Sequence, residues 1–420
     1  MKKVLLTVSV LLSAISAFSQ NVATANISGT GNTGTQTQSG VKNNSDLTIS
    51  GTNNDIITTQ TSSLLGEGQV IVSQSGDEGQ ISVTQVSANA SGSAFEYANI
   101  SQTGTSNSIS VNQSSTNEGG HNADIVQTGQ SNSITTTQSH SGSGVDILEV
   151  YQDGTDNSAT ISQINEGSSL GGFQQTAIIS QNLSPTSTNN TASITQSSYS
   201  SGTNYAEIQQ DGNMNIGSIT QSSDDISALN SALAIQGGEN NSATISQGST
   251  SASAANTANL FQTGNDNTSS IIQNGVAASS NEATSDQIGN GNSTSITQTT
   301  SLAGSSNMAT VSQFTNDNTA TISQTSDNTS GANEVSVTQQ GADGNSSMVT
   351  QEGDANTLTL TQDGNANISI IEQLGSINAI TGTQTGNINT FNGTQNGNGN
   401  TINSVQTGNN NVINFSQTGI

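Results

Sequence analysis

The chain has 420 residues with 29 Asp and Glu against 3 Lys and Arg, a net charge of −26, which argues against nucleic acid and anionic lipid as partners. Hydrophobic residues make up 29% and aromatic residues 3% of the chain, too few for an ordinary globular core of this length. The chain contains no cysteine, which excludes disulfides and cysteine-based metal sites.

Residues 1–19 have the pattern of a secretory signal peptide. Two lysines at 2–3 precede a mostly apolar stretch over 4–15, and an A-x-S cleavage site follows at 17–19. Cleavage would leave Lys42 as the one basic residue against 29 acidic ones, a net charge of −28. Neither this apolar stretch nor any later one is long enough to span a bilayer, so we expect a secreted chain without a membrane span.

The remainder, residues 20–420, is built from one seven-residue phrase, Asn-x-Φ-x-Φ-x-Gln, in which Φ is an apolar residue. Nineteen consecutive units from Asn190 to Gln417 keep Asn six residues before Gln. Because side chains alternate between the two faces of a strand, each unit predicts a β-strand with Asn, both Φ residues and Gln inward and Ser and Thr outward. The expected core includes Ile161, Ile194, Ile208, Ile245, Val311 and Ile322.

A turn with the text x-Gly-x-x-Asn is the common one after the glutamines. Glycine allows the positive φ that a four-residue turn between strands requires. The predicted turn glycines are Gly104, Gly129, Gly154, Gly212, Gly264, Gly353, Gly364, Gly375, Gly386, Gly397 and Gly408.

The spacing of the closing residues predicts the architecture. It is 11 residues over 27–60 and again over 351–417, and between 60 and 351 it alternates mostly between 11 and 14 or 15. Short units that cannot bury their own faces indicate a solenoid. We therefore predict an all-β fold, a β-solenoid of 32 strands in 16 two-stranded coils, about 75 Å long at roughly 4.8 Å per rung. The competing interpretation, a disordered Asn/Gln-rich tract, requires no fixed repeat phase.

Inward amides should form ladders, each hydrogen-bonded to its equivalents one coil above and below. The ladder residues that we predict are Asn241, Gln247, Asn267, Gln273, Asn318, Gln324, Asn356, Gln362, Asn367, Gln373, Asn378, Gln384, Asn411 and Gln417.

The ionisable residues suggest no enzyme. Acidic residues within the strands, such as Asp124, Glu149 and Glu207, should face outward by the alternation and limit aggregation. His121 and His140 fall at or near long turns, where we expect solvent-exposed, inert side chains without an acidic partner. We predict no catalytic residues, no cofactor and no metal site.

The repeat resembles that of the curlin family, whose text includes Gln-x-Gly-x-x-Asn-x-Ala-x3-Gln. The segment Gln236-Gly-Gly238-Glu-Asn-Asn241-Ser-Ala243-Thr-Ile-Ser-Gln247 matches it position for position, and Gln313 to Gln324 differs by Thr315 at the Gly position. The opening Ser of the family repeat is mostly Asn in this chain, the number of coils is larger, and no separate Gly-rich targeting stretch precedes the strands.

This resemblance implies a secreted subunit of extracellular cross-β fibres that hold bacterial biofilms together and mediate adhesion. The implied partners are further copies of the chain, other curlin-like subunits or a nucleator, and an outer-membrane secretion machinery. Because strand text runs from end to end without a visible cap, we expect end-to-end stacking of subunits. The alternative from another class is a monomeric ice-binding or surface-binding solenoid, based on outward Ser and Thr pairs such as Thr160 and Ser162.

Overall fold

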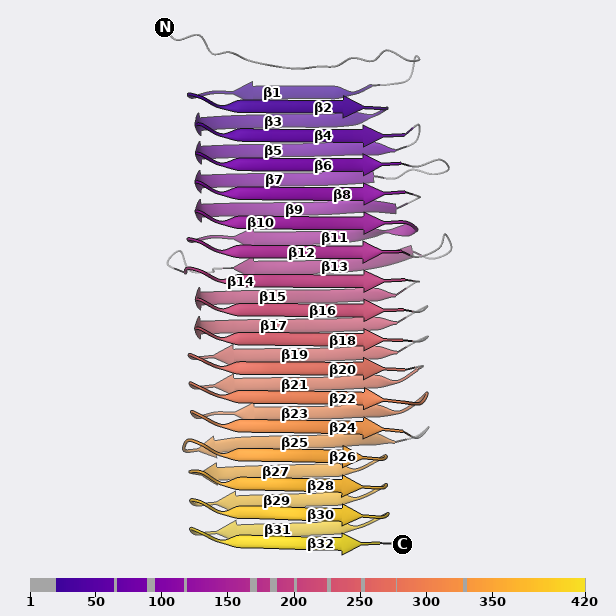
Figure 1. Ribbon diagram of the computed structural model, residues 1–420, viewed down its shortest axis with the longest axis vertical. Coiled ribbons are helices and arrows are strands. Elements are labelled where there is room, and N and C mark those ends of the chain that lie inside the picture. Colours follow the sequence, from indigo (N-terminus) through magenta and orange to yellow (C-terminus); the bar gives the residue numbers. More distant parts are fainter. Residues whose placement is uncertain are drawn as a thin grey trace. The chain divides into compact units, whose positions relative to one another are not determined.

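The computed structural model describes residues 20–63, 66–88, 95–116, 119–166, 172–181, 187–199, 202–224, 228–250, 254–276, 278–327 and 331–419. The segment interpreted as a signal peptide, residues 1–19, lies outside the described residues. The described part contains 32 β-strands and no helix, the strand count predicted from the spacing (Figure 1). The chain divides into two compact units, residues 1–214 and 215–420.

The first unit contains two parallel sheets, one of odd-numbered and one of even-numbered strands, each in chain order. The odd sheet comprises β1 (Val22–Ile27), β3 (Asn43–Thr52), β5 (Glu67–Asp77), β7 (Phe95–Thr105), β9 (Gly119–Gln130), β11 (Ser143–Gln152), β13 (Gly172–Gln181) and β15 (Thr203–Asn213). The even sheet comprises β2 (Thr33–Ser39), β4 (Asp55–Ser62), β6 (Gln80–Ser87), β8 (Ser108–Ser115), β10 (Ser133–His140), β12 (Ser158–Asn165) and β14 (Thr191–Ser198).

The second unit repeats this arrangement. Its even sheet comprises β16 (Ile216–Ser223), β18 (Ser242–Ser249), β20 (Thr268–Gly275), β22 (Ser293–Thr300), β24 (Thr319–Ser326), β26 (Ser346–Glu352), β28 (Ile368–Leu374), β30 (Thr390–Asn396) and β32 (Val412–Thr418). Its odd sheet comprises β17 (Leu229–Glu239), β19 (Ala255–Thr263), β21 (Ser280–Ile288), β23 (Ser306–Gln313), β25 (Ala332–Gly341), β27 (Thr357–Gly364), β29 (Ala379–Thr385) and β31 (Thr401–Thr407).

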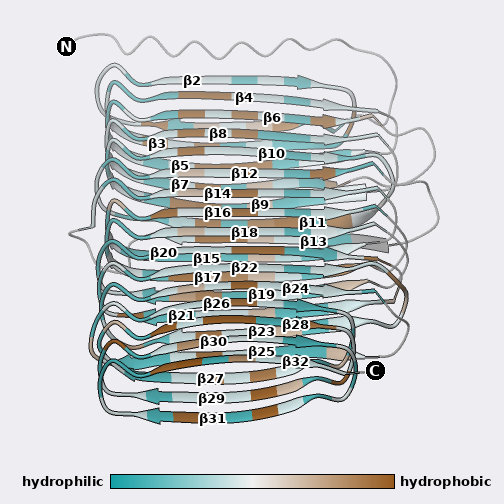
Figure 2. Ribbon diagram, turned by 60° about the horizontal axis from the view of Figure 1, so that its bottom comes forward, coloured by the Kyte–Doolittle hydropathy of each residue, from teal (hydrophilic) through white to brown (hydrophobic). Residues whose placement is uncertain are grey.

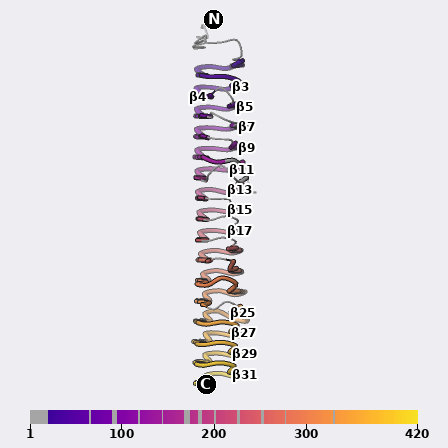
Figure 3. Tube along the Cα trace, turned by 90° about the vertical axis from the view of Figure 1, so that its right-hand side faces the viewer, coloured from indigo at the N-terminus to yellow at the C-terminus, as the bar shows by residue number. Residues whose placement is uncertain are grey.

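Consecutive strands of a unit never pair with each other; each pairs with the strand two further along the chain. The chain therefore crosses, turns and returns once per coil, as the side view of Figure 3 shows. The register keeps equivalent repeat positions in line, so that Gln247 pairs with Gln273 and Ile245 with Ile271. The predicted β-solenoid is thereby confirmed.

The core of each unit is the slot between its two sheets. Burial alternates along the strands, and the apolar positions recur as brown segments in the middle of successive strands (Figure 2). The six residues expected in the core are all at most 1% exposed: Ile161, Ile194, Ile208, Ile245, Val311 and Ile322. Burying one such side chain contributes about 1.5–3 kcal/mol, and stacking adds the same contact once per coil.

The turns use two left-handed residues rather than one. The predicted turn glycines all have positive φ, between 97° and 129°. The residue two positions after the glycine is also left-handed, and it is usually not glycine, as in Ala366 (φ 53°) and Asn410 (φ 59°). Sequence reasoning placed positive φ only at the first of these positions.

Ile377 occupies this second left-handed position with φ 61° and is 67% exposed. A β-branched residue is strained there, at a cost of about 1–2 kcal/mol. We expect Ile377→Asn to raise the free energy of unfolding by about 1 kcal/mol, measured by urea unfolding, because Asn tolerates this backbone conformation. The matched control is Ile370→Asn, at a 51% exposed position of strand β28. Equal effects of the two changes would contradict the strain argument.

Candidate functional site: amide ladders and a buried ionisable cluster

Glutamine ladders run along both sheets in each unit. In the second unit, Gln298 Nε2 donates to Gln324 Oε1 at 2.8 Å, and Gln324 Nε2 donates to Gln351 Oε1 at 2.9 Å. Gln324 Nε2 also donates across the slot to the carbonyl oxygen of Met308 in the other sheet, at 2.9 Å. Each ladder residue therefore joins successive coils and also ties the two sheets together.

Asparagine ladders close the turns. The backbone N–H of Asn367 donates to Asn345 Oδ1 at 3.0 Å, and its Nδ2 donates to the carbonyl oxygen of Gly386 at 2.8 Å. Asn367 thus links its turn to the preceding coil through its backbone N–H and to the following coil through its side chain. Buried amides would be costly without such partners, by about 1–3 kcal/mol per unsatisfied group.

The structure places the predicted ladder residues on these two ladders. Twelve of them are at most 1% exposed: Asn241, Gln247, Asn267, Gln273, Asn318, Gln324, Asn356, Gln362, Asn367, Gln373, Asn378 and Gln384. The other two, Asn411 and Gln417, flank and lie on β32 and are only partly buried. The outward direction expected of Asp124 and Glu149 is also found, since both are exposed.

A further inward position, which sequence reasoning missed, follows the glutamine by two residues in the even-numbered strands. Ser115, His140 and Asn165 occupy it on β8, β10 and β12 of the first unit, and all are at most 1% exposed. This position faces the first inward residue of the odd-numbered strands, which lies six residues before their glutamine. In the second unit this corner joins hydroxyl and amide groups: Ser249 Oγ donates to Asn230 Oδ1 at 2.9 Å.

In the first unit the same corner holds ionisable groups. The position six residues before Gln, usually Asn, is Glu96 on β7, His121 on β9 and Asp146 on β11. Register pairs Glu96 with His121, and His121 with Asp146. With His140 from β10 they form four adjacent side chains, each at most 1% exposed. We call this set the ionisable cluster.

The prediction that His121 and His140 are exposed turn residues without an acidic partner is wrong. Both lie within strands, His121 six residues before Gln127 and His140 two residues after Gln138. Even spacing from an inward glutamine directs a side chain inward. The alternation therefore predicts that both histidines are buried, in conflict with the usual exposure of histidine in turns.

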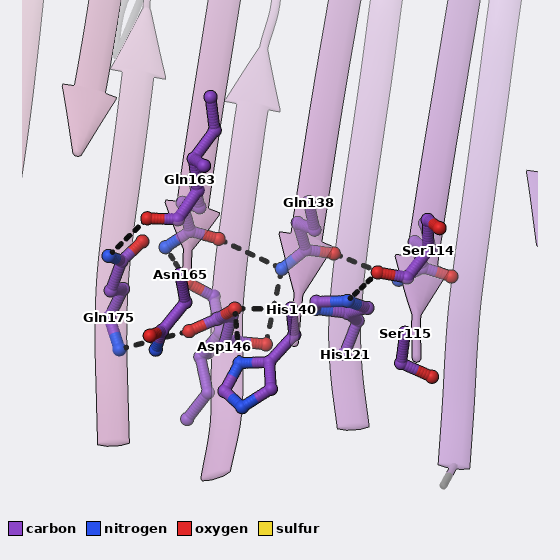
Figure 4. A network of polar contacts seen from close by, with 12 residues as sticks. Ser114, Ser115, His121, Gln138, His140, Asp146, Gln163, Asn165 and Gln175 are labelled. Carbon is purple, nitrogen blue, oxygen red and sulfur yellow. Dashed lines mark hydrogen bonds and ion pairs between the residues drawn. The ribbon is translucent and has the colours of Figure 1, made fainter. Parts of the chain in front are cut away.

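Asp146 lies at the centre of the ionisable cluster (Figure 4). Its Oδ2 is 3.3 Å from His140 Nδ1 and 3.5 Å from His121 Nδ1. Its Oδ1 accepts a hydrogen bond from the backbone N–H of Gln175, on the next odd-numbered strand, at 3.3 Å. The carboxylate thus contacts both imidazoles and the neighbouring coil.

Glu96 lies on the other side of His121. Its Oε1 accepts a hydrogen bond from the hydroxyl of Ser115, and its Oε2 is 4.0 Å from His121 Nε2. Burial raises the pKa of Glu96 from 4.5 to about 8, against the opposing effect of the Ser115 hydrogen bond. The pKa of His121 is lowered from 6.5, chiefly by burial, although Asp146 opposes that shift.

What this corner can do chemically is limited by its burial. Each of its four side chains is at most 1% exposed, too deeply buried to contact a substrate. Among the described residues no three His, Cys, Asp or Glu side chains are arranged to hold a metal ion. Nor does the described part of the chain contain a helix long and apolar enough to cross a membrane.

Comparison with known proteins gives one family. Three segments, residues 303–325, 331–364 and 353–386, match the curlin associated repeat. These segments lie in the second unit and include the ladder residues Gln324, Asn356 and Gln362. No curated protein matches the chain.

Proposed function

We propose that this chain, which belongs to the curlin-repeat family through the repeats of its C-terminal region, is a secreted structural subunit of curli-like amyloid fibres. In this role it would add to the matrix of a bacterial biofilm and promote cell adhesion and aggregation. The family accounts for the structural character of the role. Secretion, adhesion and growth by end-to-end stacking are proposed here in addition.

The observation that carries the proposal is that the two edges of a coil are complementary, one offering hydrogen-bond donors and the other acceptors. In the Gln ladder a coil donates from Nε2 on one side and accepts at Oε1 on the other, as Gln324 does. Parallel in-register strands with such amide ladders also build cross-β fibres. On β32 the ladder residue Gln417 is partly exposed, whereas Gln395, one coil earlier, is fully buried. A second copy stacked on this edge would bury Gln417 in the same way.

Further copies of the chain are the partners that this geometry favours, and the other partners are those that the family resemblance implies. Further copies of the chain would extend both ladders, and a curlin-like nucleator would offer the first edge. Release from the cell would require an outer-membrane secretion machinery. Nucleic acid is disfavoured by the net charge of −26.

The test is assembly of the purified chain. We expect fibres that bind thioflavin, show a meridional reflection near 4.8 Å, and grow without a lag when seeded with fragmented fibres. A variant with Asn411→Asp and Gln417→Glu should assemble more slowly, because carboxylates carry no N–H to continue either ladder; Asn414→Asp, an exposed neighbour on β32, is the control. A chain that stays monomeric after prolonged incubation with seeds contradicts the proposal.

A second candidate, an ice-binding or surface-binding solenoid, is favoured by one observation. In the first unit the outward residues of β6, β8, β10, β12 and β14 include no charged side chain and are mostly Ser and Thr. The odd sheet of the same unit carries Asp124, Glu149 and Glu207. Ordered hydroxyl columns could order water. Thermal hysteresis in freshly purified monomer supports this function, and its absence removes it.

A further inference from the structure

The ionisable cluster replaces residues that the rest of the chain keeps neutral. At the first inward position of the odd-numbered strands the second unit has Asn230, Asn256, Asn281, Asn307 and Asn333. At the corresponding position the first unit has Glu96, His121 and Asp146 on three successive odd-numbered strands. Burying a charge is far more costly than burying an amide. Three positions that hold neutral amides in the second unit thus hold ionisable groups in the first.

We propose that the ionisable cluster makes the folding of strands β7–β12 proton-dependent, so that this segment is most stable in mildly acidic solution and opens as the solution becomes alkaline. The proposal concerns folding within the first unit and holds whether or not the chain forms fibres.

Hydrogen-bond geometry alone requires a bound proton in the cluster. His121 Nε2 is 3.1 Å from the carbonyl oxygen of Ser114. A carbonyl only accepts, so this nitrogen carries a hydrogen. In a neutral ring Nδ1 then presents a lone pair, and it faces Asp146 Oδ2 at 3.5 Å. Two acceptors would oppose each other there, and on the other side of the ring the buried Glu96 Oε2 has no hydrogen-bond partner. The cluster is therefore short of hydrogens, and a proton held on Glu96 reduces the negative charge that it must bury.

No other charge in the described part of the chain compensates the cluster. The side chains that face the ionisable cluster from neighbouring strands are all neutral. They are Ser115 on β8, Asn165 on β12 and Gln175 on β13. On the adjacent β5, Gly68 pairs with Glu96. The basic residue Lys42 is exposed and paired with Glu67. The ionisable cluster must therefore balance its charge internally or by exchanging protons.

The signs of the two pKa shifts define the pH range. Glu96 keeps its proton up to about pH 8 when folded but loses it near 4.5 when unfolded, so stability falls as pH rises between these values. His121 resists protonation when folded, so stability falls as pH drops below 6.5. Between 4.5 and 6.5 the two effects oppose each other. Above 6.5 only the Glu96 effect remains, and stability falls until about pH 8.

Hydrogen exchange of the full chain, read by mass spectrometry at pH 5–8.5, tests the proposal. One titrating group changes the opening constant about tenfold per pH unit. Between pH 6.5 and 8 we therefore expect the protection of β7–β12 to fall about tenfold after correction for intrinsic exchange rates, since Glu96 is half ionised in the folded chain at the upper limit. Peptides from β18 and β22, whose equivalent corner carries Ser249 and Thr300 with neutral partners, should not show this loss. An equal change in both segments overturns the proposal.

Two variants assign the effect to the cluster. Glu96→Gln keeps the side-chain shape and an acceptor for Ser115 but cannot ionise, so it should abolish the loss of protection above pH 6.5. Glu149→Gln removes an exposed carboxylate from β11 and should leave the loss intact. If Glu96→Gln behaves like the unaltered chain, the proposal is wrong.

A second measurement does not depend on the variant's folding. Infrared spectra of the unaltered chain at neutral pH should contain the carbonyl band of a protonated carboxylic acid, which disappears as the solution becomes alkaline. Its absence at neutral pH overturns the proposal even if Glu96→Gln fails to fold.

Discussion

Replacing Gln324 by Leu is expected to lower the free energy of unfolding by about 3–5 kcal/mol. The substitution removes the acceptor of Gln298 and the donor to Gln351, and it leaves the Met308 carbonyl without its cross-slot partner. Gln298 and Gln351 are fully buried, so their unpaired amide groups cannot turn to water. Leu fills a similar volume, so the loss measures missing hydrogen bonds rather than a cavity.

Urea unfolding followed by circular dichroism measures this loss, and hydrogen exchange of β22–β26 locates it. Ser323→Ala on the same strand is the matched control, because its side chain points outward and surface changes usually stay within about 0.5 kcal/mol. A loss below about 1 kcal/mol for Gln324→Leu would show that the ladders fill space without stabilising the stack.

The strand architecture could be predicted because nineteen consecutive units place Asn, two apolar residues and Gln on the same face of a strand. Ile245 and Gln247 are two residues apart, which directs both inward, and the constant phase brings each opposite its equivalent on the next coil. A register shift of one residue would expose every Ile and Gln at once. The spacing of the glutamines, the alternation of side chains and the turn glycines therefore all favour the same fold.

The ionisable cluster could not be predicted in the same way, because two rules conflict there. Alternation directs Glu96, His121 and Asp146 inward, whereas charged and imidazole side chains are usually exposed. Each alone would be costly to bury. Only the parallel register, which places them on successive coils beside His140, lets them share protons and hydrogen bonds. Residues 96, 121, 140 and 146 become neighbours only when the coils stack, so the pattern within a single repeat unit does not predict the cluster.

The second left-handed turn residue was missed for a different reason. Ile377, Ala366 and Asn410 share a backbone conformation but no side-chain property. The conformation is imposed by the stacked turn around them, and their own preferences do not produce it. The first left-handed position is different, because there the neighbouring coil leaves no room for a side chain.

Replacing Gly364 by Ala is expected to cost about 3–5 kcal/mol, as much as a ladder substitution, although Gly364 lies in a surface turn. Its φ is 129°, which L side chains rarely adopt, and a Cβ added there would lie 2.0 Å from the carbonyl oxygen of Gly386 in the next coil. Backbone strain contributes about 1–3 kcal/mol and overpacking a similar amount. The contact is with backbone, so no side chain can rotate away, and relief requires the two coils to separate locally.

Gly399 is the matched control because it occupies the second left-handed position of a turn, with φ 70° and no atom within 4 Å of an added Cβ. Asn410 holds this position one turn later with φ 59°. Gly399→Asn should therefore change the urea midpoint little, and Gly399→Ala should cost about 1 kcal/mol. Similar losses for Gly364→Ala and Gly399→Ala would contradict the steric argument. A large loss only at Gly364 would show that close approach between coils, rather than turn flexibility, requires glycine at the first left-handed position of this turn.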